Sequence, residues 1–281
     1  MSQIYPTPGS QFEAIHSALT TSTSPEILRQ AAANLLNLIE HQHGGYYERV
    51  AARHFLCDLL SRSYFFPRGA ADCVAEALNT SEKPRRLFAQ IGTADDRAGL
   101  NLVNARLAGA SIDFTDAVLP YANLSNAYLS GKTFRGADLS GAVLNRSMCA
   151  NSQFVGCRMP GIRLVEADCS GVTITYCDSY SASQLPSWGA DLTGACFDES
   201  TFQSVNLQGA SLVRTVLRSA TLENVDLRGA NLAGADLVGA TLTDVDLRGA
   251  NLTGAIWGSD EQWCDVRTDG AITAGYPLPE Q

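Results

Sequence analysis

The chain has 281 residues, a net charge of −9 and a charged fraction of 17%. Soluble domains carry roughly 25% charged residues, and nucleic-acid-binding proteins are basic, so direct binding to nucleic acid is not expected. No apolar run approaches the roughly 18 residues of a membrane span, and the N-terminus lacks the layout of a signal peptide. We therefore expect a cytoplasmic protein that does not bind membranes, with secretion as an effector left open.

Residues 1–97 have the pattern of a small all-α domain that resembles a HEAT-like fragment, with a flexible segment expected at 1–9. Ser10 and Glu13 have the spacing of a capping box ahead of a first helix. Ser24-Pro25 opens a second helix, because proline suits the first helical position. Further helices are predicted at 50–59 and 70–78, with a short fifth helix at 85–91. These helices can cap the structure that follows them.

Residues 98–257 repeat a short pattern every five residues, and the octapeptide VDLRGANL occurs at 225–232 and again at 245–252. Neither a helix, with a period near 3.6, nor a strand, with a period of 2, explains a period of five. A chain that turns a corner every five residues does. A large central residue and a small residue two positions before it then point inward, and four corners close a square turn of twenty residues. At the usual strand spacing, roughly eight such coils make a rod about 35–40 Å long.

The side chains within the repeat follow the same rule. Glycine often stands two positions after the centre, where a type II turn requires a positive φ. Cys149 and Cys169 are centres one coil apart, and we expect these thiols to fill a narrow core as small hydrophobic groups. Lys132 occupies a small inward position, so its stem is expected to reach outward to water.

The pattern A(D/N)LxG, as in residues 137–141 and 230–234, resembles the pentapeptide-repeat family. The resemblance implies a mainly β fold, a right-handed quadrilateral β-helix. In Qnr-type members, which look similar in their coils, loops that leave the β-helix contribute to engaging DNA gyrase, and negative charge is thought to mimic DNA. Related β-helices often dimerise through their C-terminal ends. The resemblance therefore implies a protein partner, with a type II topoisomerase such as DNA gyrase as the named candidate, and a homodimer.

The repeat is interrupted between Ile174 and Leu192, a spacing of eighteen residues that equals three pentads and three extra residues. We expect a loop near 176–190 that projects from the rod, where binding tends to reside. The candidate partner-binding residues of this loop are Tyr180, Gln184, Leu185, Pro186 and Trp188. A tolerated surface insertion is the alternative.

Two other surfaces are candidates. Asp226, Asp236 and Asp246 form a candidate acidic face, although Arg228 and Arg248 follow two of these residues closely. Residues 258–281 form a C-terminal cap or tail, in which Trp257 and Trp263 can cover the exposed core or form a dimer interface.

The chemistry of the chain does not favour an enzyme. All four histidines precede the repeat, no phosphate-binding motif is present, and the eight cysteines lack metal-binding or disulfide spacing. We predict no catalytic residue, no metal and no cofactor. The hypothesis is a protein-interaction scaffold, in its sharpest form a DNA-mimicking modulator that protects a type II topoisomerase against poisons. One alternative is an effector or targeting adaptor that binds a host or cellular protein, for which the Ser/Thr-rich segment 17–26 could serve export; another is an enzyme with its site in residues 1–97.

Overall fold

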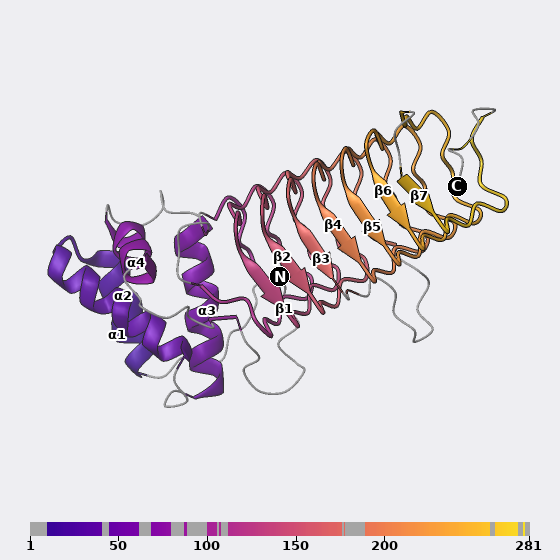
Figure 1. Ribbon diagram of the computed structural model, residues 1–281. Coiled ribbons are helices and arrows are strands. Elements are labelled where there is room, and N and C mark those ends of the chain that lie inside the picture. The colour runs from indigo at the N-terminus through magenta and orange to yellow at the C-terminus, as the bar shows by residue number, and fades with distance from the viewer. Residues whose placement is uncertain are drawn as a thin grey trace.

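The computed structural model of the protein describes residues 10–40, 45–61, 69–79, 87–88, 100–105, 107, 112–175, 177, 189–258, 262–274 and 278. Four helices lie at one end of an elongated molecule, and a parallel β-solenoid extends from them to the other end (Figure 1). The expected combination of a helical N-terminal part and a β-helix is confirmed. Within the described residues, no helix has the length and apolar character that a bilayer span requires.

The N-terminal helices pack around one central helix. Their bounds are α1 (Ser10–Thr21), α2 (Pro25–Glu40), α3 (Tyr46–Ser61) and α4 (Ala70–Asn79). α2 contacts the other three helices, because its apolar residues recur at helical spacing and are buried along its length. The Phe12 N–H, which no carbonyl of α1 can reach, donates to Glu48 of α3 at 2.9 Å.

The short helix expected at 85–91 is not found in the part of the chain that the structure describes. Leu87 and Phe88, the described residues of that segment, form a turn and are fully buried. Phe88 stacks on Phe114 with ring centroids 5.5 Å apart, and its carbonyl accepts the Val118 N–H at 2.7 Å. Phe88 therefore occupies the place of a rung residue before the first complete coil and covers the end of the file of stacked rings.

The solenoid has one column of short strands, in which the central residue is buried and the outer residues are exposed or half-buried. The strands pair in parallel in chain order: β1 (Thr133–Arg135), β2 (Gln153–Val155), β3 (Thr173–Thr175), β4 (Thr201–Gln203), β5 (Thr221–Glu223), β6 (Thr241–Thr243) and β7 (Gln262–Cys264). Seven strands on one side define about six complete turns.

Three further columns of parallel bridges complete each square turn. In one turn, Thr221, Asp226, Asn231 and Asp236 follow at five-residue intervals, and each pairs with the residue twenty positions later. Leu227 and Leu247 are both buried, and the Leu227 N–H donates to the Asp246 carbonyl at 2.8 Å. On one side the bridges continue from Asn101 to Ile272 in eight successive steps, beyond the turns that the named strands define.

Each corner of the square requires a positive φ at the position two after the central residue. Glycines there confirm the expected turn chemistry, with φ of 64° at Gly229 and 68° at Gly249. The requirement does not depend on glycine, because the same position carries positive φ at Arg214 (56°) and Asn224 (53°). Hydrogen bonds along the rod offset the strain, since fifteen non-glycine residues of the described chain adopt a positive φ.

The core follows the two inward positions of every pentad. Phe114, Phe134 and Phe154 stack in one file, with ring centroids 4.5 and 4.8 Å apart. Cys149 and Cys169 are fully buried, as expected of thiols that fill space. Lys132 is largely buried, with 8% exposure, and desolvation lowers its pKa.

The interruption between Ile174 and Leu192 is not made of three pentads and three extra residues, as expected from the spacing. Ile174 pairs with Phe202, 28 residues later in place of the usual 20, so the turn contains eight extra residues. Cys177 and Gly189 bound the insertion. The chain therefore completes two pentads and adds eight residues between Ile174 and Leu192, because the backbone ladder must resume in register.

Candidate interaction surfaces

The outward residues of the solenoid form four faces, and each face has its own chemistry. The strand face is formed by β1–β7 and is rich in threonine. The ladder face is defined by the bridged residues Asp138, Arg158, Asn206, Asp226, Asp246 and Arg267 and the residues two positions after each. The third face follows the bridges from Asn101 to Ile272. The apolar face is defined by the bridged residues Tyr128, Met148, Asp168, Cys196, Val216, Asp236 and Ile256 and the residues two positions after each.

The aspartates and asparagines of these faces have a structural role. Each commonly accepts the N–H of the residue two positions later, as Asp138 does from Ser140 at 3.0 Å and Asn251 from Thr253 at 3.0 Å. This local bond stabilises the corner that follows. The recurrence of carboxylates along the rod is therefore explained by turn formation.

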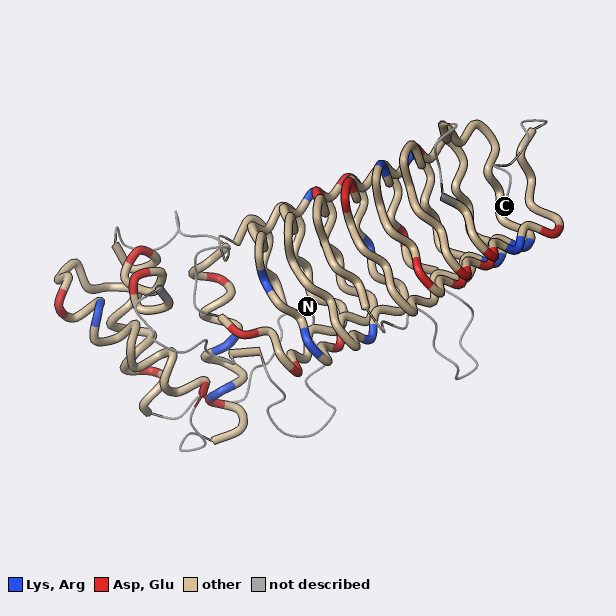
Figure 2. The backbone as a smooth tube through the Cα atoms, viewed as in Figure 1, with Lys and Arg blue, Asp and Glu red and all other residues tan. Residues whose placement is uncertain are grey.

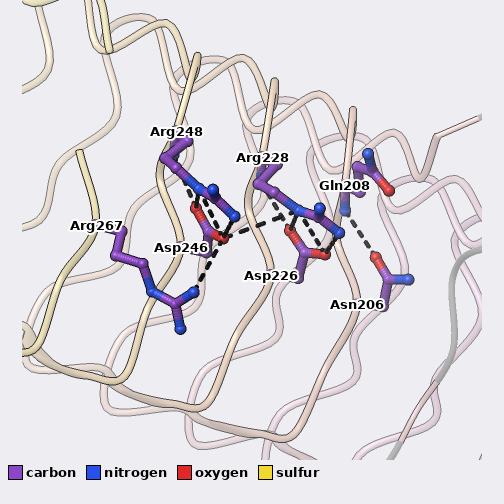
Figure 3. A network of polar contacts seen from close by, with 7 residues as sticks. All are labelled: Asn206, Gln208, Asp226, Arg228, Asp246, Arg248 and Arg267. Carbon is purple, nitrogen blue, oxygen red and sulfur yellow. Dashed lines mark hydrogen bonds and ion pairs between the residues drawn. The ribbon is translucent and has the colours of Figure 1, made fainter. Parts of the chain in front are cut away.

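On the ladder face, Asp226 and Asp246 are each paired with an arginine of their own turn (Figure 3). Arg228 Nε lies 2.8 Å from Asp226 Oδ1, and Arg248 Nε lies 2.9 Å from Asp246 Oδ1, each arginine also donating through Nη2 to Oδ2. Asp246 also lies 3.9 Å from Arg228 Nε and 3.9 Å from Arg267 Nη1. Acidic and basic positions accordingly lie side by side along this edge of the rod (Figure 2).

The electrostatics of the ladder follow from these pairs. Hydrogen bonds from Arg228 lower the pKa of Asp226, and hydrogen bonds from Arg248 lower the pKa of Asp246. Both carboxylates are ionised near neutral pH, but three arginines offset their two charges. Mimicry of a DNA backbone requires a continuous negative stripe, and this part of the ladder does not present one.

The structure brings together only two of the three residues of the candidate acidic face. Asp226 and Asp246 are direct neighbours on the ladder face, whereas Asp236 lies on the apolar face, two corners away along the chain. Asp236 is buried and accepts a hydrogen bond from Arg218 Nε at 2.6 Å. Spacing by ten residues places a side chain two faces away, so a single acidic face with all three is not formed.

The loop candidates Tyr180, Gln184, Leu185, Pro186 and Trp188 lie outside the described residues. At the C-terminal end, Trp263 is buried and pairs with Leu242, so it continues the core file of the strand face. Trp257 is half-buried, with its ring centroid 6.1 Å from that of Trp263. Ile256, the residue before Trp257, and Ile272 are exposed.

The apolar face is a surface that the sequence reasoning missed. Six large hydrophobic side chains of the described solenoid are strongly exposed, and four of them lie on this face: Tyr128, Met148, Val238 and Ile256, at 40–53% exposure. A signal was present in the sequence, because Tyr128, Met148 and Ile256 stand at the outward position where aspartate or asparagine is usual, and Val238 stands at the variable outward position of its pentad.

The helical part contains a cavity and an aromatic contact of a histidine among its described residues. A cavity of 290 Å³ lies between α1 and α2, and its lining has aliphatic side chains with amides from Gln11, Gln30 and Asn34 but no titratable group. His16 packs against Phe12 and Phe55, with a ring distance of 4.6 Å to Phe55. In the described part of the chain, no three histidine, cysteine or acidic side chains are grouped as a metal site.

Comparisons with known proteins identify the type of repeat. A family model described as pentapeptide repeats matches residues 98–131, 122–161, 188–224 and 220–256. A search of curated proteins finds no match.

Similar solved structures include HetL, a pentapeptide repeat protein involved in heterocyst differentiation regulation in the cyanobacterium Nostoc. The match has 22% identity and a TM-score of 0.32, and it covers 61% of this chain and 82% of HetL. QnrB1, a plasmid-mediated fluoroquinolone resistance protein, has 22% identity, coverage of 58% and 82%, and a TM-score of 0.35. Rfr23 of the cyanobacterium Cyanothece has 30% identity, coverage of 34% and 63%, and a TM-score of 0.25. With these matched pentads and the square turns that pair them in register, the chain belongs to the pentapeptide-repeat family.

Proposed function

We propose that this protein is a non-enzymatic scaffold that binds a protein partner along the side of its solenoid. The proposal rests on the different roles of the inward and outward positions within each pentad. Inward positions are filled by packing side chains, while outward positions of one kind align in columns over many turns. Repeat architectures use such extended, rigid surfaces for binding.

A direct test compares the intact protein with a variant that lacks residues 178–188. Affinity capture followed by cross-linking should recover a partner with the intact chain, and loss of that partner on deletion would assign the contact to Tyr180, Gln184, Leu185, Pro186 and Trp188. Unchanged capture would place the contact on the faces of the rod. Failure of the intact chain to form any stable complex would overturn the scaffold proposal.

The sharper form of the proposal is a modulator of a type II topoisomerase such as DNA gyrase, with protection against topoisomerase poisons. Its support is the shared repeat with QnrB1, a fluoroquinolone resistance protein. Because arginines offset the charges of Asp226 and Asp246, we place this contact on the inserted loop and not on DNA mimicry by the ladder face. A supercoiling assay with purified gyrase tests this hypothesis. If micromolar protein neither inhibits gyrase nor protects it against the drug, the topoisomerase hypothesis is wrong.

The same scaffold could serve instead as an effector or targeting adaptor that binds a host or cellular protein through a face of the rod. A homodimer through the C-terminal end is a separate part of the proposal, and it would use Trp257 with the exposed Ile256 and Ile272. Sedimentation of the intact protein tests it. A monomer at all accessible concentrations would remove the dimer without affecting the scaffold.

A further inference from the structure

The exposed hydrophobic side chains of the apolar face form two groups. Tyr128 and Met148 lie at the end near the helices, and Val238 and Ile256 lie toward the C-terminus. Six bridging steps separate Tyr128 from Ile256, so the face is about 29 Å long at the usual strand spacing. Each group is a pair of exposed apolar side chains on neighbouring rungs, and the rungs between the two groups carry polar and charged side chains.

Net negative charge lies between the two groups, where the face carries Asp168, Asp198 and Asp236 against one arginine, Arg218, on the rung next to Asp198. Asp168 is bridged to Cys196, and Asp198 follows Cys196 by two residues, so the two carboxylates lie on adjacent rungs. Within the described chain, neither aspartate forms an ion pair, whereas Asp236 on the same face is paired with Arg218. Asp198 Oδ1 is also shielded from solvent without a hydrogen-bond partner.

We propose that the apolar face docks a basic amphipathic helix of a partner protein; this deepens the scaffold proposal and rests on it. A helix of about 19 residues spans the 29 Å face, since each residue rises 1.5 Å. Aliphatic or aromatic side chains near its two ends would cover Met148 and Val238, and lysines or arginines at its centre would meet Asp168 and Asp198. A second copy of this chain fits less well, because two such faces would bring the same acidic centres together.

The test uses a labelled model helix of 19 residues made of leucine and lysine, with the lysines concentrated at its centre. A second peptide has glutamate in place of every lysine. Fluorescence anisotropy with the full-length protein at low salt should show binding of the lysine peptide and at least about tenfold weaker binding of the glutamate peptide. Higher salt should weaken the binding of the lysine peptide, since the central contacts are charged. Equal binding of the two peptides, or no binding of either, would overturn the proposal.

Variants locate the site. Asp168→Asn combined with Asp198→Asn keeps the shapes of the side chains and should raise the dissociation constant of the lysine peptide about tenfold. Met148→Ser combined with Val238→Ser should weaken it comparably. The matched control, Asp191→Asn with Val165→Ser on the third face, should leave binding unchanged; an equal loss in this control would overturn the proposal. Circular dichroism of each variant verifies that the solenoid is intact.

This proposal and the scaffold proposal fail in different ways. If the apolar-face variants bind every captured partner as the intact chain does, the partner contact lies elsewhere and the scaffold stands. If the intact chain forms no complex at all, the scaffold proposal fails, whatever the peptides do.

Discussion

Gly189, the first described residue after the insertion, gives the sharpest test of how closely the turns are packed. A Cβ atom at this position would lie 2.5 Å from the Gly209 carbonyl oxygen, 2.9 Å from its carbon and 3.1 Å from the Ala210 Cα. These are backbone atoms of the next turn. They are held by bonds from the Gly209 N–H to the Arg228 carbonyl at 3.0 Å and from the Ser211 N–H to the Ala190 carbonyl at 2.9 Å.

Gly189→Ala should therefore lower the free energy of unfolding by about 3 kcal/mol, the upper part of the range for overpacking, because no flexible side chain can yield. Gly249→Ala is the matched control. Its Cβ would meet no atom within 4 Å, so only its φ of 68° is unfavourable. That strain costs roughly 1–2 kcal/mol.

Urea unfolding followed by far-ultraviolet circular dichroism measures both values, with the slope of the transition checked for change. The reasoning is refuted if Gly189→Ala costs no more than Gly249→Ala, because the loss would then arise from glycine's conformational freedom and not from contact between turns.

Three further predictions concern the core, the ladder and the thiols. Phe154→Leu removes a stacked ring and should lower stability by about 1–2 kcal/mol in the same assay; an unchanged urea midpoint would contradict the stack. Hydrogen bonds from arginine hold the pKa values of Asp226 and Asp246 below the ordinary value of about 3.9. The stability that these two carboxylates contribute is therefore present above about pH 3.9, and it is lost as the pH falls through their pKa values in the folded protein. The variant with both aspartates changed to asparagine should thus be less stable than the native chain at about pH 6, and the gap should narrow below about pH 4; a gap independent of pH would exclude the linkage. Iodoacetamide should label the exposed Cys264 well before Cys57, whose pKa burial raises, as mass spectrometry can show; similar rates would mean that α3 opens readily.

The five-residue period fixed the inward and outward positions because the pattern is local: each pentad makes its own corner, and the square allows one large and one small inward residue. The same period predicted positive φ at the corners. It could not show that arginine and asparagine would also occupy such corners. Their positive φ is supported by hydrogen bonds between neighbouring turns, and these bonds depend on the register of the folded rod.

What tertiary structure alone decided depends on register between turns. The eighteen residues from Ile174 to Leu192 can be divided in more than one way, and only the pairing of Ile174 with Phe202 shows eight extra residues. Register also separates Asp236 from Asp226 and gathers exposed hydrophobic side chains, far apart in sequence, on one face. The sequence alone determined the coil, because each corner is a local event; the structure decided the surfaces, because side chains become neighbours there only through contacts between successive turns.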